Sequence, residues 1–349
     1  MSRLLIYGVP LVVLAAVGLS YAWQSMTGPL YRPGDVRAGK VAEPLAPATD
    51  SGGRWLVAPN IELYHFESGT GTPILTVHGG PGFPPTQPWR AAPLLADRFR
   101  LIYYHQRGCG QSTRPISSFP GPNMYGNMRQ LNQSLGLGAQ VADIERIRGI
   151  LGVDKLILIG HSFGADLAAF YAAEFPEHIR ALVYVAPADL VVMPNPDSDL
   201  FSLVRQRLPA GMRPEYEAYM TEYLDFGRAF RRTEAESSAF YGRFANYYGA
   251  ATGLHAPESS DASAAGFVPL AAFCGMGKHH DYSAALRAIH APVLVIHGAN
   301  DLQPESASRH FAAYFGGSRF VTVEGAGHFV FDDRPQEFAA AVRGFLTDL

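Results

Sequence analysis

The stretch of sequence that decides the fold is Leu156–Gly164, which reads LILIGHSFG. Its first part, Leu156–Gly160, is apolar throughout, as expected for a strand covered on both faces of a parallel sheet. The residues after Ser162 are rich in alanine and continue as a helical pattern as far as Phe175, where Pro176 ends it. A buried strand that turns directly into a helix predicts an α/β architecture with Ser162 at the turn.

The same stretch has the form that a nucleophilic serine requires. A serine hydroxyl is a weak nucleophile and must be held clear of its neighbours, within reach of a base. A sharp strand-to-helix turn does this by straining the backbone at the serine, and the glycines at 160 and 164 let strand and helix pack closely around it. Ser162 is therefore the predicted nucleophile. Because position 162 is Ser, an aspartate-nucleophile dehalogenase or epoxide hydrolase is disfavoured.

Outward from this stretch, short β-rich runs alternate with helix-like segments, which predicts a doubly wound, mostly parallel sheet. The predicted strands are Ile61–Phe66, Ile74–His78, Leu101–His105, Leu156–Gly160, Ala181–Ala186, Val293–His297 and Arg319–Val323, and the helices between them include Gly138–Leu151 and Phe163–Phe175. The alternation breaks between Pro187 and His290, where the sequence becomes helical and rich in aromatic residues. An insertion at this place predicts a helical cap over the carboxyl edge of the sheet.

The chain is therefore expected to contain an interrupted core and two N-terminal segments. The core covers residues 54–186 and 291–349, and the cap covers residues 187–290. Residues 24–53 are rich in Pro, Gly and Ala without periodicity, which predicts a linker. Residues 1–23 contain Leu4–Trp23, an uncharged run of 20 residues that is long enough to span a bilayer as a helix.

The uncharged run predicts a transmembrane anchor, contact with a membrane and a single-pass membrane localisation. A cleaved signal peptide is the alternative, because Ser20-Tyr21-Ala22 is a small-x-small site. Arg3 precedes the run, whereas Arg32, Arg37 and Lys40 follow it, so the distribution of positive charge gives no orientation. The side of the membrane stays open.

A glycine-rich loop, His78-Gly79-Gly80-Pro81-Gly82, follows the second predicted strand. The tetrahedral intermediate of acyl transfer carries an oxyanion, which needs hydrogen-bond donors already in place. In this kind of site one donor is the N–H of the residue after the nucleophile, here Phe163, and the other comes from such a loop. Because Pro81 has no N–H, Gly80 is the predicted second donor, and Gly79 is the alternative.

Asp301 and His328 complete the predicted catalytic triad. His328 follows the last predicted strand on a loop that reads GAGH, and Asp301 lies just past the end of the strand before it. The chain order Ser162, Asp301, His328 is the order expected for a serine nucleophile on such a sheet. The imidazole would take the serine proton, and Asp301 would orient the ring and stabilise its charged form. Asp189, after the strand Ala181–Ala186, is the alternative acid.

Composition limits the function classes. The net charge of −3 and the lack of like-charged runs argue against a nucleic-acid partner. Cys109 and Cys274 cannot form a disulfide framework and have no metal-ligand spacing. We therefore expect no metal site and no nucleic-acid partner, and we expect a small molecule or a short peptide as substrate.

Three motifs together resemble the proline iminopeptidase group of α/β-hydrolases. They are the HGGPG loop, the run Gln106-Arg107-Gly108-Cys109-Gly110-Gln111-Ser112 and the turn at Ser162. The resemblance covers roughly residues 55–349. It implies the α/β-hydrolase fold and release of an N-terminal residue, typically proline, from small peptides without a cofactor. The sequence differs from the family pattern in two places. His105 stands where the family usually has Asp. The turn at Ser162 reads GHSFG, as in many esterases, instead of GGSWG.

The substrate class stays open between amides and esters. An aminopeptidase must also bind the ammonium group of its substrate, which requires carboxylates over the pocket. Glu215 and Glu222 are the first cap candidates, although ordinary solvated helix faces explain them equally well; the other cap acids considered are Glu217, Asp225, Glu234 and Glu236. We predict a serine hydrolase that forms an acyl-enzyme on small amide or ester substrates. Of the two subclasses, an iminopeptidase-like aminopeptidase is favoured slightly over a carboxylesterase or lipase-like hydrolase. A non-catalytic hydrolase-fold binding protein is the remaining alternative, and the intact triad and oxyanion loop count against it.

Overall fold

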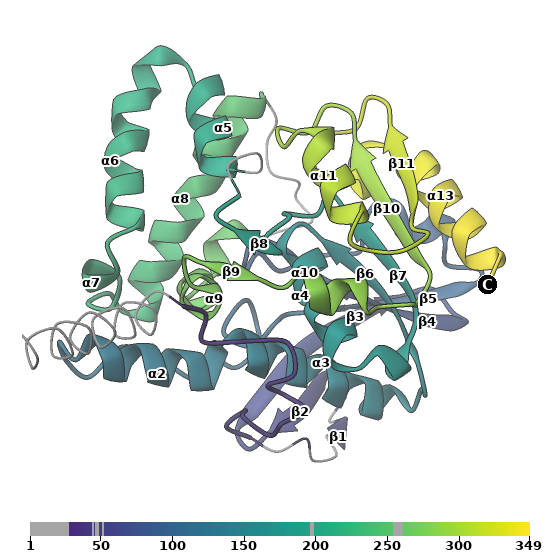
Figure 1. The fold of residues 1–349 in the computed structure, drawn as a ribbon, viewed down its shortest axis with the longest axis horizontal. Coiled ribbons are helices and arrows are strands. Elements are labelled where there is room, and N and C mark those ends of the chain that lie inside the picture. Colours follow the sequence, from purple (N-terminus) through teal and green to yellow (C-terminus); the bar gives the residue numbers. More distant parts are fainter. Residues whose placement is uncertain (1–27, 44, 46–48, 51, 196–198, 254–260) are drawn as a thin grey trace, which may run out of the picture.

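The computed structural model describes residues 28–43, 45, 49–50, 52–195, 199–253 and 261–349. Within these residues a sheet of nine strands has the order β1-β2-β3-β5-β4-β6-β7-β10-β11. The strands are β1 (Thr49–Asp50), β2 (Arg54–Ala58), β3 (Ile61–Ser68), β4 (Thr72–Val77), β5 (Phe99–Tyr104), β6 (Leu156–His161), β7 (Ile179–Val185), β10 (Val293–Gly298) and β11 (Arg319–Val323). From β5 to β11 all neighbours are parallel, and β1 to β3 add an antiparallel edge. The predicted doubly wound, mostly parallel sheet is confirmed (Figure 1).

The central strands bury side chains on both of their faces. Along β6, Leu156 and Leu158 belong to one hydrophobic core, whereas Ile157 and Ile159 belong to the other. Successive side chains of a strand point to opposite faces, so a strand covered on both sides must be apolar at every position. One face is covered by α3 (Leu137–Leu151), α4 (Phe163–Glu174), α10 (Ser283–Arg287) and α11 (Glu305–Ala312), and the other by α12 (Val330–Asp333) and α13 (Pro335–Thr347).

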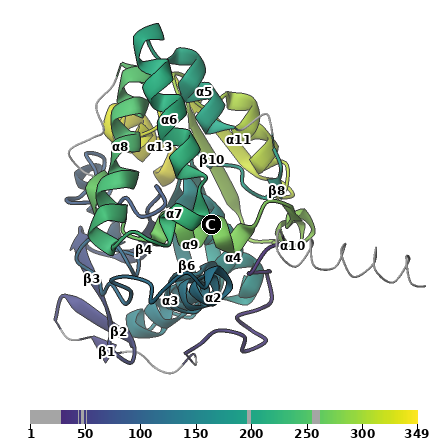
Figure 2. The same cartoon turned by 90° about the vertical axis from the view of Figure 1, so that its left-hand side faces the viewer.

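The aromatic insertion forms a helical layer beside the sheet. It contains α5 (Leu200–Arg207), α6 (Arg213–Tyr223), α7 (Phe226–Ala229), α8 (Glu234–Thr252) and α9 (Val268–Met276), and a two-stranded ribbon of β8 (Val192–Met193) and β9 (His280–Asp281) connects it to the core. Figures 1 and 2 show α5, α6 and α8 standing together, on the side away from α3 and from α2 (Met124–Leu135).

Most cap aromatics form the core of the cap itself. The ring of Tyr219 lies 4.9 Å from that of Phe240 and 5.1 Å from that of Tyr247. Phe244 and Tyr248, also on α8, pack against this core and in addition line the pocket that contains Ser162. The aromatic side chains of α8 therefore both fill the core of the cap and form part of the pocket wall.

Part of the segment expected to be a linker is packed against the core. Tyr31 is 2% exposed, and its hydroxyl donates to Glu174 at 3.1 Å. The N–H groups of Gly34 and Val36 donate to the same carboxylate oxygen at 2.7 and 3.2 Å. Other backbone N–H groups of the segment bind the carbonyl of Gly275 or form turns within the segment, so it is not a free linker over this stretch.

The prediction of a membrane-spanning helix is wrong. The single-pass localisation and the membrane contact were inferred from that helix, and they are wrong with it. No helix in the described part of the chain is both long and apolar enough to cross a bilayer. The longest of them, α8, has 19 residues and carries Glu234, Glu236 and Arg243. The run Leu4–Trp23 lies outside the described residues. The prediction rested on length and absence of charge alone.

Candidate active site

Ser162 occupies a strained turn between β6 and α4. Its φ of 54° and ψ of −126° are unusual for a residue with a side chain. The turn is held because the Ser162 N–H donates to the carbonyl of Val185 at 2.9 Å. A side-chain carbon on Gly164 would lie 2.1 Å from the carbonyl oxygen of Val77, so only glycine lets α4 approach β4 this closely. The serine therefore stands at the sheet edge on the kind of turn that its motif predicts.

His328 and Asp301 meet at the same edge, on the loops after β11 and β10. The distance from His328 Nδ1 to Asp301 Oδ2 is 2.8 Å, and the Asp301 side chain is 1% exposed. The N–H of Gln303 donates to the other carboxylate oxygen at 3.1 Å. His328 also lines the pocket that contains Ser162. The three predicted triad residues thus come together at one place.

Asp189, the alternative acid, has a different partner. Its Oδ2 lies 2.8 Å from Nδ1 of His310 on α11, and the side-chain amide of Asn195 donates to the same oxygen at 2.9 Å. Asp301, and not Asp189, is therefore the carboxylate paired with His328.

Burial and pairing act in opposite directions on the His328–Asp301 pair. Burial alone would lower the pKa of His328, but the adjacent Asp301 carboxylate outweighs this effect and raises that pKa above its ordinary value. Burial would raise the pKa of Asp301, but His328 and the Gln303 N–H stabilise the carboxylate and lower that pKa instead. The pair therefore favours an ionised Asp301 and a more basic imidazole.

The acidic limb of the pH–rate profile should follow from this shift. A base must be unprotonated to act, so kcat/KM should rise as the pH increases through the pKa of His328. Because that pKa is raised, the midpoint of the limb should lie above about 6.5, the ordinary value for histidine. Burial lowers the pKa values of His78 and His161 to about 3, so neither should titrate in this range. A kcat/KM profile with its midpoint well below 6.5 would contradict this assignment of the base.

The glycine-rich loop of residues 78–82 lies directly against the turn at Ser162. Gly80 lines the pocket with Ser162. A side-chain carbon on Gly79 would lie 2.8 Å from Cβ of Ser162 and 3.4 Å from the amide nitrogen of Phe163. That amide opens α4, where the first N–H groups have no partner within the helix. The two predicted donors, Gly80 and Phe163, thus belong to backbone segments that border the same pocket.

Gln106, the first residue of the motif Gln106–Ser112, holds this loop. The backbone N–H of Gln106 donates to Nε2 of His78 at 3.1 Å, and its side-chain amide donates to the His78 carbonyl at 2.8 Å. Since Nε2 accepts, the proton of the neutral ring lies on Nδ1, which donates to the carbonyl of Gly79 at 3.0 Å. His78 therefore links Gln106 to the glycine-rich loop through hydrogen bonds and fixes the position of that loop.

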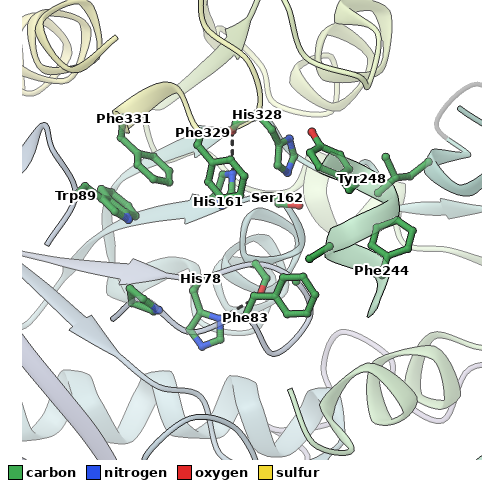
Figure 3. A pocket seen from close by; sticks show the side chains of 15 residues that line it. His78, Phe83, Trp89, His161, Ser162, Phe244, Tyr248, His328, Phe329 and Phe331 are labelled. Atoms are coloured by element: carbon green, nitrogen blue, oxygen red, sulfur yellow. Dashed lines mark hydrogen bonds between the residues drawn. The ribbon is translucent and has the colours of Figure 1, made fainter. Parts of the chain in front are cut away.

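His161 has a similar supporting position beside the base. Its Nε2 donates to the backbone carbonyl of His328 at 3.0 Å, and the two rings are 4.7 Å apart (Figure 3). A carbonyl can only accept, so His161 carries its proton on Nε2. His161 therefore fixes the loop that carries His328 and orients it.

The pocket around Ser162 is small and largely apolar. Its volume is about 90 Å³. The apolar part of its wall consists of Phe83, Pro85, Trp89, Leu200, Phe244, Ala245, Phe329 and Phe331 (Figure 3). Its polar side chains are Ser162, His328, His78, His161 and Tyr248, and no carboxylate of the described residues lines it. The described ranges also contain no group of three or more His, Cys, Asp or Glu side chains suited to a metal ion.

Glu215 and Glu222, the candidates for binding a substrate ammonium, do not line this pocket. Glu215 accepts a hydrogen bond from the Tyr247 hydroxyl at 2.8 Å, and its side chain is 66% exposed. Glu222 is paired with Arg232 at 2.7 Å. Both acids therefore take part in contacts within the cap instead of reaching the serine.

Ser162, Asp301 and His328 follow the ends of β6, β10 and β11, in this order along the chain. This placement and this order are typical of an α/β-hydrolase. Residues 72–335 match the family model described as alpha/beta hydrolase fold, and the chain belongs to this family.

Relatives within the family differ in their named activities. The proline iminopeptidase of Heyndrickxia coagulans is 23% identical over 293 residues, which are 81% of this chain and 93% of that protein. The 2-hydroxymuconate semialdehyde hydrolase of Pseudomonas sp. strain CF600 is 27% identical over 301 residues, which are 85% of this chain and 94% of that protein. A solved thermophilic esterase from Thermogutta terrifontis has a TM-score of 0.54 at 23% identity, over 82% of this chain and 94% of that one, and supports the fold alone. The similarity to proline iminopeptidases is confirmed, and the protein is an enzyme of the α/β-hydrolase class.

Proposed function

We propose that the protein is a serine hydrolase that cleaves small, uncharged esters through an acyl-enzyme on Ser162. The observation that carries this proposal is the wall of the pocket, which is aromatic and aliphatic around the serine. Such a wall binds an apolar acyl or alkyl group by removing it from water. The polar side chains of the pocket comprise the proposed nucleophile and base, the two histidines that hold their loops, and Tyr248.

In the proposed acylation step, Ser162 Oγ attacks the ester carbonyl while His328 takes the serine proton. The negative charge moves to the carbonyl oxygen, which the N–H groups of Gly80 and Phe163 stabilise. Collapse of this intermediate breaks the bond to the alkoxy oxygen, and the imidazolium returns its proton to the leaving alcohol. Asp301 keeps the imidazole in the orientation and tautomer that this transfer needs.

Deacylation repeats the same steps with water as the nucleophile. His328 takes a proton from the water, the hydroxide forms a bond to the acyl carbon, and Ser162 Oγ leaves with the proton from the imidazolium. The products are a carboxylic acid and an alcohol, and the enzyme returns to its initial state.

Iminopeptidase activity is the second candidate, because the similarity to the Heyndrickxia enzyme extends over 93% of that protein. A prolyl ring would also suit a compact apolar pocket. Its ammonium group, however, needs a carboxylate partner, since burying an unpaired charge costs several kcal/mol. Glu215 and Glu222 make other contacts, so we place ester hydrolysis first and reverse the order expected from the sequence.

A panel of three substrates separates the two activities. We expect p-nitrophenyl butyrate to be hydrolysed with a kcat/KM at least ~10²-fold above that of prolyl-β-naphthylamide. We also expect N-acetylation of the prolyl amide to cause no loss, because an ester site has no partner for the ammonium. Ser162→Ala, measured alongside, gives the background rate.

The opposite pattern would establish the peptidase. If prolyl-β-naphthylamide turns over well and acetylation lowers kcat/KM by ~10² or more, the site recognises a positive charge and the ester proposal is wrong.

A further inference from the structure

The loop that carries Asp301 is tied to a neighbouring segment by one buried side chain. Gln303, two residues after the acid, is 4% exposed. Its side-chain amide donates to the backbone carbonyl of Ala188 at 3.1 Å, and its backbone N–H donates to the Asp301 carboxylate at 3.1 Å. Gln303 therefore contacts the triad acid with its backbone and the segment after β7 with its side chain.

The segment that follows β7 is itself fixed to the core. Ala186 and Asp189 have φ values of 45° and 54°, in a left-handed region that residues with side chains adopt where their surroundings hold them. The N–H of Ala186 donates to a carbonyl of β10 at 2.8 Å, and the N–H of Leu190 donates to the Asp166 carboxylate at 2.9 Å. Asp166 lies on α4, the helix that begins directly after Ser162. The segment therefore connects the helix of the nucleophile to the loop of the acid.

Other backbone bonds hold the beginning of the acid loop. The N–H of Asp301 donates to the carbonyl of Gly298 at the end of β10, at 2.9 Å. The N–H of Asn300 donates to the carbonyl of Ala326, on the loop after β11, at 2.8 Å. These bonds lie on the side of β10 and β11, whereas the side chain of Gln303 fixes the loop from the side of β7.

We propose that Gln303 is a positioning residue of the triad: by holding its loop to the Ala188 carbonyl, it keeps the Asp301 carboxylate at hydrogen-bond distance from His328. The proposal rests on the serine-hydrolase function proposed above and deepens it by adding a residue that acts through the acid. Gln303 does not line the pocket, so it has no direct part in binding the substrate. A misplacement of about 1 Å in a catalytic site can cost ~10² in rate, so one bond that sets the position of the acid can affect turnover.

Loss of this bond should also change the basicity of His328. The adjacent Asp301 carboxylate raises the pKa of His328, so a carboxylate that is held less closely should let that pKa fall toward its ordinary value. The other titratable groups facing the pair are His161, His297, Tyr248 and Asp333. A substitution of Gln303 leaves all of them in place.

The test measures the rate at which a fluorophosphonate labels Ser162 in the full chain, as a function of pH, because this reaction needs the triad but no particular substrate. Gln303→Met removes the donor and keeps a side chain of similar length. In this variant we expect the plateau rate to fall about tenfold or more and the midpoint of the acidic limb to fall by about half a pH unit. Gln303→Asn, whose amide is set back by one methylene, should show the same changes. Thermal unfolding verifies that each variant is folded.

Gln140→Met is the matched control. Gln140 is 3% exposed, and its side-chain amide donates to the backbone carbonyl of Arg107 at 3.0 Å. The same substitution there removes a comparable buried bond that does not involve the Asp301 loop. This variant should keep the plateau rate and the midpoint of the wild type.

Two results would overturn the proposal. If the Gln303 variants label with the plateau rate and the midpoint of the wild type, the bond to Ala188 does not position Asp301. If Gln140→Met changes both quantities equally, the effect comes from the loss of a buried amide in general and not from this contact. A wild type that does not label at all would instead refute the serine-hydrolase function, so the two failures are distinguishable.

Discussion

Ser162→Ala should lower kcat for p-nitrophenyl butyrate by about 10⁵-fold or more, the largest effect that any single substitution should produce. Alanine leaves the His328–Asp301 pair and the oxyanion donors in place but provides no atom that can become acylated. The remaining rate would come from binding and from the oxyanion hole acting on water. The measurement is steady-state kcat, with a fluorophosphonate used to titrate any wild-type contamination.

A serine outside the pocket provides the control for this substitution. The hydroxyl of Ser318 donates to the carbonyl of Ala312 at 2.9 Å, behind α11, so Ser318→Ala should keep wild-type kcat. If Ser162→Ala retained kcat within about tenfold of the wild type, Ser162 would not be the nucleophile.

Asp301→Asn should lower kcat by ~10³ or more while leaving the fold intact. Asp301 accepts from Nδ1 of His328 at 2.8 Å, which leaves the lone pair of Nε2 free to act as the base. The amide of asparagine can instead donate to Nδ1 and place the proton on Nε2, where it blocks transfer from Ser162. The measurement is kcat on the same ester, with circular dichroism to verify folding.

Asp189→Asn is the matched control, because Asp189 is also a buried aspartate paired with a histidine, here His310. We expect this variant to lose far less activity than Asp301→Asn. If Asp189→Asn were crippling and Asp301→Asn mild, the acid of the triad would be misassigned.

Much of the core could be predicted from the sequence because a strand covered on both faces has to be apolar throughout. Each of the seven predicted strands has a counterpart in the sheet whose ends differ by at most two residues. The strand β2 was missed because Arg54–Ala58 is only five residues long, begins with a charge and adjoins a glycine-rich stretch. Its pairing with β3, rather than its own pattern, defines it.

The meeting of Ser162, Asp301 and His328 could be predicted for a related reason. Parallel strands end at one edge of a sheet, so residues just past the ends of β6, β10 and β11 must lie near one another. The supporting groups lacked such a signal. Gln106 belonged to a recognisable motif, but its bonds to His78 depend on how two loops approach each other in space.

The cap was the least predictable part of the site. The sequence shows acidic and aromatic side chains on its helices, but not which face of each helix is turned toward the serine. Glu215 and Glu222 make contacts within the cap, whereas Tyr248, one of many cap aromatics, lines the pocket beside His328. Helix periodicity defines faces, and only tertiary packing determines which face covers the pocket.

Peptide mapping after treatment with a fluorophosphonate tests the central claim most directly. Mass spectrometry should find one adduct, on the peptide that contains Ser162, and hydrolytic activity should fall in proportion to its occupancy. An adduct on another residue, or full activity at complete labelling of Ser162, would contradict the assignment of this serine as the nucleophile.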